Sequence, residues 1–259
     1  MFDEVRFVYR LNDNMQESLR NIDNKLGKIV ICDRQKVDSL IIKTKARMIH
    51  ASLSIEGNTL SLFDVEKICE NSQVIRMKNE VQEVRNALEL YDNIKGYDYK
   101  SEEAFLKAHS VLMQGLNSNG GEYRNHGEGI QKNGYLIYQA PDSLLVPSLM
   151  HSLFDLLKNE SINKIVLAAL FHYYFVTVHP FTDGNGRMAR FWVNLILISY
   201  NEKFEFIPID EEIYLNQGKY YEVIDKSHNN ENANEFITFM LESINLALDK
   251  TLIYEGKII

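Results

Sequence analysis

Apolar side chains recur every three or four residues along most of this chain, which is the spacing of one face of an α-helix. Residues 1–30 are polar and weakly patterned, and they predict one short helix over Asn14–Leu26 that ends at Gly27. The pattern sharpens after Asp33, a good N-cap, and runs to Gly57-Asn58, a usual helix end. A helix over about 35–57 is therefore predicted, with a buried face of Val37, Leu40, Ile41, Thr44, Met48 and Ala51.

Three further helices are predicted between residues 61 and 117. Ser61 is placed to cap Leu62–Glu70, Asn79 opens a second helix, and Ser101 opens a third. The second helix carries Val81, Val84, Leu88 and Tyr91 on one face, and the third carries Phe105, Ala108, Leu112 and Leu116. His109 lies beside the last face, and it is interpreted as a packed histidine, as are His50 and His172.

The helical pattern disappears between residues 120 and 141. Glycines punctuate this stretch, and Tyr135-Leu136-Ile137-Tyr138 is rich in residues that favour β-strands. Asn133-Gly134 suits a two-residue turn between two short strands. A small β-hairpin is therefore predicted here, and taken alone it is an ordinary surface hairpin.

Helical patterning returns in the C-terminal half, so the fold class is predicted to be all-α, a helical core with a small β-hairpin. The predicted elements are a helix capped by Asp142 that runs through Leu157, a buried helix capped by Ser161 or Asn163, an extended connection Phe204–Ile209, and helices Asp210–Ser227 and Asn234–Leu252.

Two uncharged apolar runs, Ile165–Val178 and Phe191–Tyr200, flank a junction that holds one imidazole, one carboxylate, an asparagine amide, two glycines and two guanidiniums. The first run is too long for an ordinary buried strand, so a buried helix is predicted. Pro180 cannot sit inside that helix and pushes His179 toward an extended conformation. The helix is therefore expected to end at this histidine.

The loop after this helix is rich in residues that bind phosphate. Gly184 and Gly186 allow a tight turn, and Asp183 or Asn185 is available to cap the next helix. That helix places three polar side chains on one face, those of Arg187, Arg190 and Asn194. A helix N-terminus attracts anions, arginine binds phosphate oxygens and aspartate binds hard cations. The sequence therefore predicts a phosphate site here.

Composition narrows the class of protein. The chain has 259 residues, of which 45% are hydrophobic and 25% are charged, as expected of a globular protein. A net charge of −8 argues against nucleic-acid binding as its main purpose. Cys32 and Cys69 lie far apart, which suits a reducing cytosol, and no signal peptide or membrane-spanning run is found. We expect a cytoplasmic protein that does not enter a membrane.

Residues His179–Arg190 read His-Pro-Phe-Thr-Asp-Gly-Asn-Gly-Arg-Met-Ala-Arg. This stretch resembles the signature of the Fic (filamentation-induced-by-cAMP) domain, His-Pro-Phe-x-Asp-Gly-Asn-Gly-Arg-x-x-Arg, at every specified position. The resemblance implies the helical Fic fold and transfer of AMP from ATP to a Tyr, Ser or Thr hydroxyl of a target protein. It implies that His179 deprotonates the hydroxyl and that Asp183 holds Mg²⁺ on the phosphates. The other implied contacts are Asn185 with the amides of Gly184 and Gly186 near the α-phosphate, Arg187 near the β-phosphate and Arg190 near the γ-phosphate.

A second stretch resembles the same family. Ser52-Leu53-Ser54-Ile55-Glu56-Gly57 is similar to the Ser/Thr-x-x-x-Glu-Gly/Asn motif of the Fic inhibitory helix, with Ser52 and Glu56 one helical turn apart. The resemblance implies that Glu56 pairs with Arg190 and keeps ATP out of its productive position. Residues 1–75 would then be an N-terminal segment carrying the inhibitory helix, and 76–259 the Fic core. Taken alone, Glu56 is a solvated residue at a helix end that disfavours anions.

Two weaker correspondences complete the resemblance. Gly120–Asn125 resembles the turn that precedes the Fic flap, so the hairpin is implied to clamp the target by strand pairing. The residues implied to dock the target are Gly134, Tyr135, Leu136 and Ile137. Tyr220 and Tyr221 fall where family members line the nucleotide-base pocket, although aromatic residues at helical spacing are more often core.

Other functions remain to be weighed. Residues 184–189 also spell Gly-x-Gly-x-x-Ala, but a dinucleotide fold requires a strand before it, and no P-loop sequence is present. Doc toxins, which phosphorylate, depart from the signature at the glycine that Gly186 retains, so AMP transfer is preferred. De-AMPylation assisted by Glu56, another phosphoryl-type transfer and a nucleotide-binding regulatory module are the alternatives. The target protein and the oligomeric state, a homodimer included, are left open.

Overall fold

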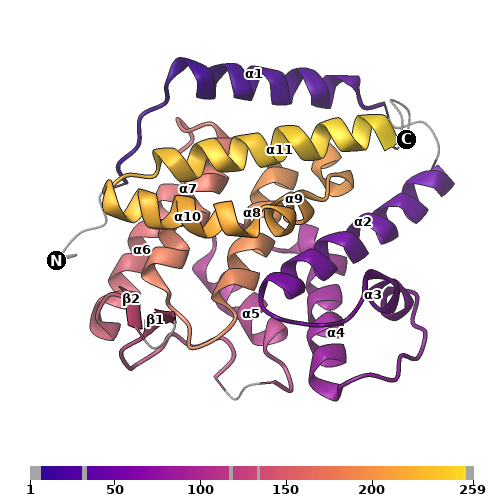
Figure 1. Ribbon diagram of the computed structural model, residues 1–259, viewed down its shortest axis with the longest axis horizontal. Coiled ribbons are helices and arrows are strands. Elements are labelled where there is room, and N and C mark those ends of the chain that lie inside the picture. The colour runs from indigo at the N-terminus through magenta and orange to yellow at the C-terminus, as the bar shows by residue number, and fades with distance from the viewer. Residues whose placement is uncertain (1–6, 31–33, 117–118, 133–134, 255–259) are drawn as a thin grey trace.

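The computed structural model describes residues 7–30, 34–116, 119–132 and 135–254, although no side chain is described for 34–38, 130–137 or 254. Helices dominate this part of the chain, as predicted (Figure 1). The α-helices are α1 (Asp13–Lys28), α2 (Arg34–Ile55), α3 (Leu62–Cys69), α4 (Lys78–Asp92), α5 (Glu102–Leu112), α6 (Val146–Leu157), α7 (Lys164–Val178), α8 (Asn185–Tyr200), α9 (Ile209–Leu215), α10 (Gln217–Asn229) and α11 (Asn234–Tyr254). The 3₁₀ helices are η1 (Ile94–Gly96), η2 (Ser143–Leu145) and η3 (Glu202–Phe206), and the strands are β1 (Gly129–Lys132) and β2 (Tyr135–Gln139).

The helices α7 and α8 form the centre of the molecule and pack against each other. Almost every side chain of α7 is buried, which explains why its sequence is apolar on all faces instead of amphipathic. Helices α6 and α11 both pack against α7. Helix α5 packs against α6 and α8. Helix α1 lies outermost, along α11 (Figure 1).

Phe105 of α5 is an aromatic hub of this core. Its ring lies 4.9 Å from that of Trp192, 5.2 Å from that of Phe175 and 5.4 Å from that of Phe154. These partners come from α8, α7 and α6, so one side chain ties the central pair to two neighbouring helices.

Helix α2 packs against α3, α4, α9 and η3, and it contacts α8 of the central pair. Of the predicted face, Leu40, Thr44, Met48 and Ala51 are buried and Ile41 is partly buried, while the side chain of Val37 is not described. Arg47 forms an ion pair with Glu211 of α9. The helix ends just before Gly57, whose φ of 92° explains the glycine there. The end of α2 is therefore placed at one defined position over α8.

Several predicted caps are confirmed. Ser61 forms a capping box with Asp64 at α3, and Ser101 caps α5. The cap of α1 at Asn12 was not predicted, and α1 runs to Lys28, beyond its predicted end at Gly27. Asn163, not Ser161, caps α7. The proposed cap Asp33 lies outside the described residues.

Other predicted boundaries are wrong. Helix α4 begins at Lys78, one residue before Asn79, and α5 ends at Leu112, before Leu116. Asp142 caps η2, and α6 starts later than predicted, at Val146. Pro147 then lies in the first turn of α6, which is where a helix tolerates proline.

The segment from 204 to 227 also differs from its prediction. The stretch predicted as extended, Phe204–Ile209, begins inside η3, where Phe204 and Phe206 are buried. Asn201 caps η3, because its side chain accepts a hydrogen bond from the backbone N–H of Lys203. The single helix predicted over Asp210–Ser227 is two helices that meet at Asn216.

The predicted hairpin is present as an antiparallel pair, β1 with β2, in which Lys132 is opposite Tyr135. Its predicted turn residues 133 and 134 lie outside the described part of the chain. Tyr138 anchors the hairpin, because its hydroxyl donates to the carbonyl of Thr177 at 2.5 Å. Its ring also stacks on that of His228 at 4.6 Å.

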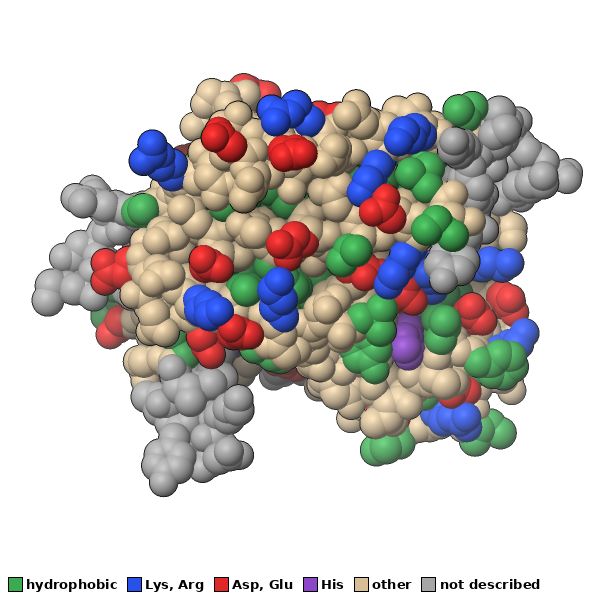
Figure 2. All heavy atoms as spheres, turned by 45° about the horizontal axis from the view of Figure 1, so that its top comes forward, with side chains coloured by type: hydrophobic (Ala, Val, Ile, Leu, Met, Phe, Trp, Pro, Cys, Tyr) green, Lys and Arg blue, Asp and Glu red, His purple; other side chains and the backbone are tan. Residues whose placement is uncertain are grey.

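Acidic and basic side chains are interspersed over the face that carries α1 and α11 (Figure 2). None of the helices within the described ranges is both long enough and apolar enough to cross a membrane. Cys69 is a free thiol, partly buried at the end of α3.

Replacing Phe105 by alanine tests the aromatic hub. The side chain is fully buried, so we expect the free energy of unfolding to fall by about 3–5 kcal/mol. Phe63→Ala is the matched control, because that ring is 65% exposed, and a change within about 0.5 kcal/mol is expected. Guanidinium denaturation measures both, and equal losses would contradict this description of the core.

Candidate active site

A short loop connects two helices whose side chains are mostly buried. Helix α7 ends at Val178 and α8 begins at Asn185, so residues 179–184 lie between them. Because α7 and α8 pack tightly against each other, both ends of this loop are fixed. The loop is therefore a rigid place from which to present side chains.

His179 caps the end of α7 in a left-handed conformation, with φ 49° and ψ 59°. The prediction of an extended conformation is wrong. Pro180 excludes the right-handed helical region for this residue, but a left-handed residue also ends a helix and turns the chain more sharply. The amide of His179 still donates to the carbonyl of Phe175 at 2.9 Å.

Arg124 holds this bend from outside. Its guanidinium, which is buried, donates to four carbonyl oxygens, those of His126, Pro141, Val178 and His179. Its own amide donates to the carbonyl of Pro180 at 2.8 Å. One side chain thus joins the segments before and after the hairpin, at His126 and Pro141, to the bend at His179. From the sequence, Arg124 was predicted only as part of the turn Gly120–Asn125, and its role in holding the bend at His179 was not predicted. The available signal was an arginine that directly follows a glycine turn.

The inside of the loop is held by Asn185 and His109. The amide of Asn185 accepts from the N–H of Phe181 at 3.0 Å and donates to its carbonyl at 2.7 Å. His109 stacks on the Phe181 ring at 3.5 Å. The predicted phosphate contact of Asn185 stays a prediction, since both ends of its amide are engaged within the loop.

His109 is packed, as predicted, and it also has a definite tautomer. Its Nδ1 accepts from the amide of Gly121 at 2.9 Å, so the proton lies on Nε2, which donates to the carbonyl of Asp183 at 2.9 Å. Burial lowers the pKa of His109 to about 4, which keeps the ring neutral and suited to these two bonds.

The start of α8 differs from the prediction, because neither Asp183 nor Asn185 caps it. Gly184 is the N-cap, with φ 82° and no side-chain bond. A Cβ there would lie 3.0 Å from the sulfur of Met113 and 3.2 Å from Nε2 of His109. Glycine is therefore required for both conformation and space. The first amides of α8 are left without a side-chain cap, as an anion site requires.

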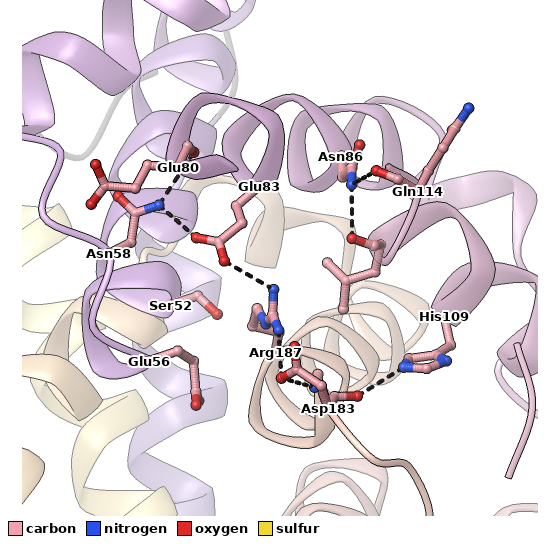
Figure 3. A network of polar contacts seen from close by, with 12 residues as sticks. Ser52, Glu56, Asn58, Glu80, Glu83, Asn86, His109, Gln114, Asp183 and Arg187 are labelled. Carbon is pink, nitrogen blue, oxygen red and sulfur yellow. Dashed lines mark hydrogen bonds and ion pairs between the residues drawn. The ribbon is translucent and has the colours of Figure 1, made fainter. Parts of the chain in front are cut away.

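Two buried arginines follow on α8. Arg187 pairs with Asp183 at 2.8 Å and faces Glu83 of α4 at 3.7 Å (Figure 3). Arg190 is 1% exposed and pairs with Glu56 at 2.7 Å. Buried nitrogens Nε and Nη1 of Arg187 and Nη1 of Arg190 make no hydrogen bond within the described residues. These donors are arranged to bind an anion with several oxygens.

Ser52 and Glu56 both reach Arg190 from the end of α2; the resemblance implied the Glu56 contact, whereas the contact of Ser52 was not predicted. Arg190 donates through Nε to the Ser52 hydroxyl at 2.8 Å and through Nη2 to the Ser52 carbonyl at 2.9 Å. Although burial works against the charge, the Glu56 carboxylate raises the pKa of Arg190 above its ordinary value. The guanidinium is therefore held as a cation.

The carboxylate of Glu56 also lies against the first turn of α8. A Cβ placed on Gly186 would come within 2.1 Å of Oε1 of Glu56. Only glycine at this position lets the carboxylate approach so closely. An anionic group is thus already seated between the N-terminal end of α8 and its buried arginine.

His179 is half-buried, and its pKa is lowered chiefly by that burial, with the neighbouring Glu128 working in the opposite direction. A lowered pKa keeps the imidazole neutral near pH 7, which is the form that accepts a proton.

The remaining candidates are spread around the site. Tyr220 is buried and its hydroxyl lies 2.9 Å from Nε2 of His172, whereas Tyr221 is 47% exposed, so their role in base binding stays a prediction. Tyr135, Leu136 and Ile137 form the backbone of β2, and Gly134 lies outside the described residues. The side chain of Asp183 is 55% exposed beside the arginines.

Known proteins resemble this chain along most of its length. A family model described as the Fic/DOC family matches residues 99–197. A Fic family protein of Desulfovibrio desulfuricans G20 with a crystal structure is 33% identical, with a TM-score of 0.92, over 97% of this chain and 78% of that one.

Two curated relatives are enzymes by name. The chain is 31% identical over 157 residues to a probable protein adenylyltransferase of Aquifex aeolicus (strain VF5), covering 57% of this chain and 46% of that protein. It is 27% identical over 249 residues to a protein adenylyltransferase Fic of Nematostella vectensis, covering 92% of this chain and 56% of that protein. The chain spans about half the length of these curated relatives.

The close approach of Glu56 to Gly186 can be tested by a double-mutant cycle. Gly186→Ala should lower the free energy of unfolding by about 1–3 kcal/mol, because the added methyl group overlaps the carboxylate. In a Glu56→Gly background the same change should leave the free energy of unfolding unchanged or raise it by up to about 1 kcal/mol, because alanine favours a helix more than glycine does. Chemical denaturation of the four proteins measures the coupling, and purely additive effects would show that the two residues do not touch.

Proposed function

The chain belongs to the Fic/DOC family, and on that basis we propose that it is a protein adenylyltransferase that moves AMP from ATP to a hydroxyl side chain of another protein. The observation that carries this proposal is the Glu56 carboxylate bound to Arg190 at 2.7 Å against the first turn of α8. An anion is held there by a buried cation and a helix N-terminus, which are the two features that bind a polyphosphate.

We assign the role of general base to His179. The target hydroxyl oxygen would attack the α-phosphorus of ATP, the bond from that phosphorus to the bridging oxygen would break, and pyrophosphate would leave. The hydroxyl proton would pass to the neutral imidazole, which its lowered pKa keeps ready to accept it. The left-handed backbone, fixed by Arg124, determines where that imidazole points.

We assign phosphate binding to Arg187, Arg190 and the first amides of α8. Phosphoryl-type transfer depends mainly on positioning and on neutralising charge, and these buried donors supply both. Arginine also presents its donors in a planar fork that matches the geometry of phosphate oxygens.

The donor set at Asp183 fits Mg²⁺ carried on the phosphates. Among the described residues there is no group of three or more histidine, cysteine or acidic side chains that could hold a metal alone. Mg²⁺ commonly binds through one or two carboxylates together with substrate phosphates, and Asp183 offers a partly exposed carboxylate. When bound, the ion would neutralise charge on the phosphates.

We assign autoinhibition to Glu56. As long as its carboxylate holds Arg190, an incoming phosphate has to displace it or bind in a different arrangement. The hairpin β1–β2, which is tied to α7 through Tyr138, is the segment proposed to hold the target by adding a strand.

Labelled ATP tests the activity directly. Glu56→Gly should raise auto-AMPylation at least 10-fold, because it frees Arg190 for the phosphates, and adding His179→Ala should abolish the transfer. The matched controls are Glu70→Gly, a glutamate at the end of α3 that pairs with Lys67, and His151→Ala, an exposed histidine of α6. Both controls should leave the rate unchanged.

Two outcomes would overturn this assignment. Affinity for ATP with no AMP adduct by mass spectrometry in any variant would make the chain a nucleotide-binding regulatory module. A Glu56→Gly variant that transfers no faster than the parent would remove Glu56 as the inhibitor.

The pH dependence of transfer tests the role of His179. Burial lowers the pKa of His179 below the ordinary value of 6.5. The neutral imidazole, which acts as the base, is therefore lost only as the pH falls through this lowered pKa. The rate of the Glu56→Gly variant at saturating Mg²⁺ and ATP should therefore be level at pH 7–8 and fall on an acidic limb centred below 6.5. A limb centred above 6.5 would contradict the proposed base.

A further inference from the structure

The chain that follows Glu56 is held by α4. The side-chain amide of Asn58 donates to Oε2 of Glu83 at 2.7 Å and to the backbone carbonyl of Glu80 at 3.2 Å (Figure 3). Thr59 donates to the Glu80 carboxylate through its amide at 2.8 Å and its hydroxyl at 2.7 Å. We call residues 56–58 the inhibitory turn. Its position over α8 thus depends on two carboxylates of α4.

The other oxygen of Glu83 faces the phosphate site. Oε1 lies 3.7 Å from Nη1 of Arg187, on the side opposite Asp183 (Figure 3). Arg187 is 6% exposed and Glu83 is 27% exposed, so water screens this attraction only in part. One carboxylate therefore touches both the inhibitory turn and an arginine of the signature.

We propose that Glu83 is a positioning residue that couples the inhibitory turn to Arg187. This proposal rests on the proposed function and deepens it. A polyphosphate on Arg187 repels the Glu83 carboxylate and competes for its partner. As Glu83 moves away, Asn58 loses its strongest acceptor and the hold on Glu56 weakens. Binding of nucleotide and release of the turn then favour each other, as linkage requires of two coupled equilibria.

Glu80 provides the comparison that separates coupling from simple anchoring. It lies one turn earlier on α4 and binds Thr59 by two hydrogen bonds, but its carboxylate makes no ion pair with Arg187 among the described residues. A residue that only fastens the loop would behave like Glu80. Glu83 differs because its charge also acts on the phosphate site.

The first arm of the test measures ATP affinity by calorimetry in the Glu56→Gly background. Glu83→Gln keeps an acceptor for Asn58 but removes the charge beside Arg187, so the Kd for ATP should fall about 2- to 5-fold, the range of a partly exposed ion pair. Glu80→Gln should leave the Kd unchanged. An unchanged Kd for Glu83→Gln, or equal changes for both variants, would overturn the proposal.

The second arm measures auto-AMPylation with Asn58→Ala, which removes the link and keeps both charges. With Glu56 present the rate should rise about 10-fold, the worth of one hydrogen bond to a charged group. With Glu56→Gly the same change should have no effect, and a similar rise in both backgrounds would overturn the coupling. Melting temperatures of all variants show whether each one is folded.

The two proposals fail in different ways. If the Glu56→Gly protein forms no AMP adduct at all, the proposed activity is wrong, yet the calorimetric arm still tests whether Glu83 opposes phosphate binding. If the adduct forms and Glu83→Gln binds ATP like its parent, the activity stands and the coupling is wrong.

Discussion

A guanidinium buried in the core has to be given a counter-charge, and Arg190 is such a group. Its side chain is 1% exposed, and leaving an ion of this kind without a partner costs several kcal/mol. Ser52 and Glu56 supply three acceptors from the end of α2. A second carboxylate, Asp210, is fully buried in the same region and also acts on Arg190. The end of α2 is therefore held over α8 by the requirement to satisfy a charge.

On the proposed function, that requirement explains how one residue, Arg190, can serve both inhibition and phosphate binding. A group that replaces Glu56 has to bring negative charge and several acceptor oxygens, because water reaches Arg190 poorly. The phosphates of ATP meet both conditions. On the proposed function, the contact between Glu56 and Arg190 is thus one that the phosphates of the substrate are chemically able to replace.

Much of this arrangement could be predicted from the sequence, because it is encoded locally. The glycine–asparagine–glycine loop between two apolar runs indicates a helix N-terminus, and the spacing of Ser52 and Glu56 places both on one face of α2. The pairing of Glu56 with Arg190 was predicted from the resemblance of these stretches to Fic motifs, and the structure confirms the contact.

The residues that were missed act over long sequence distances. Arg124 binds carbonyls of Val178 and His179, and His109 binds that of Asp183, so their roles depend on how separate helices meet. No periodicity within one segment reports such contacts. The left-handed backbone of His179 was missed because proline excludes one conformation without selecting between the others.

The two arginines of the signature differ in how firmly they are held. Arg190 takes its three hydrogen-bond acceptors from Ser52 and Glu56 at the end of α2. Arg187 lies between the side chains of Asp183, which is 55% exposed, and Glu83, which is 27% exposed. Arg190 donates two of its hydrogen bonds to Ser52, one of them at the backbone carbonyl, whereas the ion-pair partners of Arg187 within the described residues are carboxylate side chains. On the proposed function, a polyphosphate can therefore engage Arg187 by moving side chains, and it reaches Arg190 only when the backbone at the end of α2 moves as well.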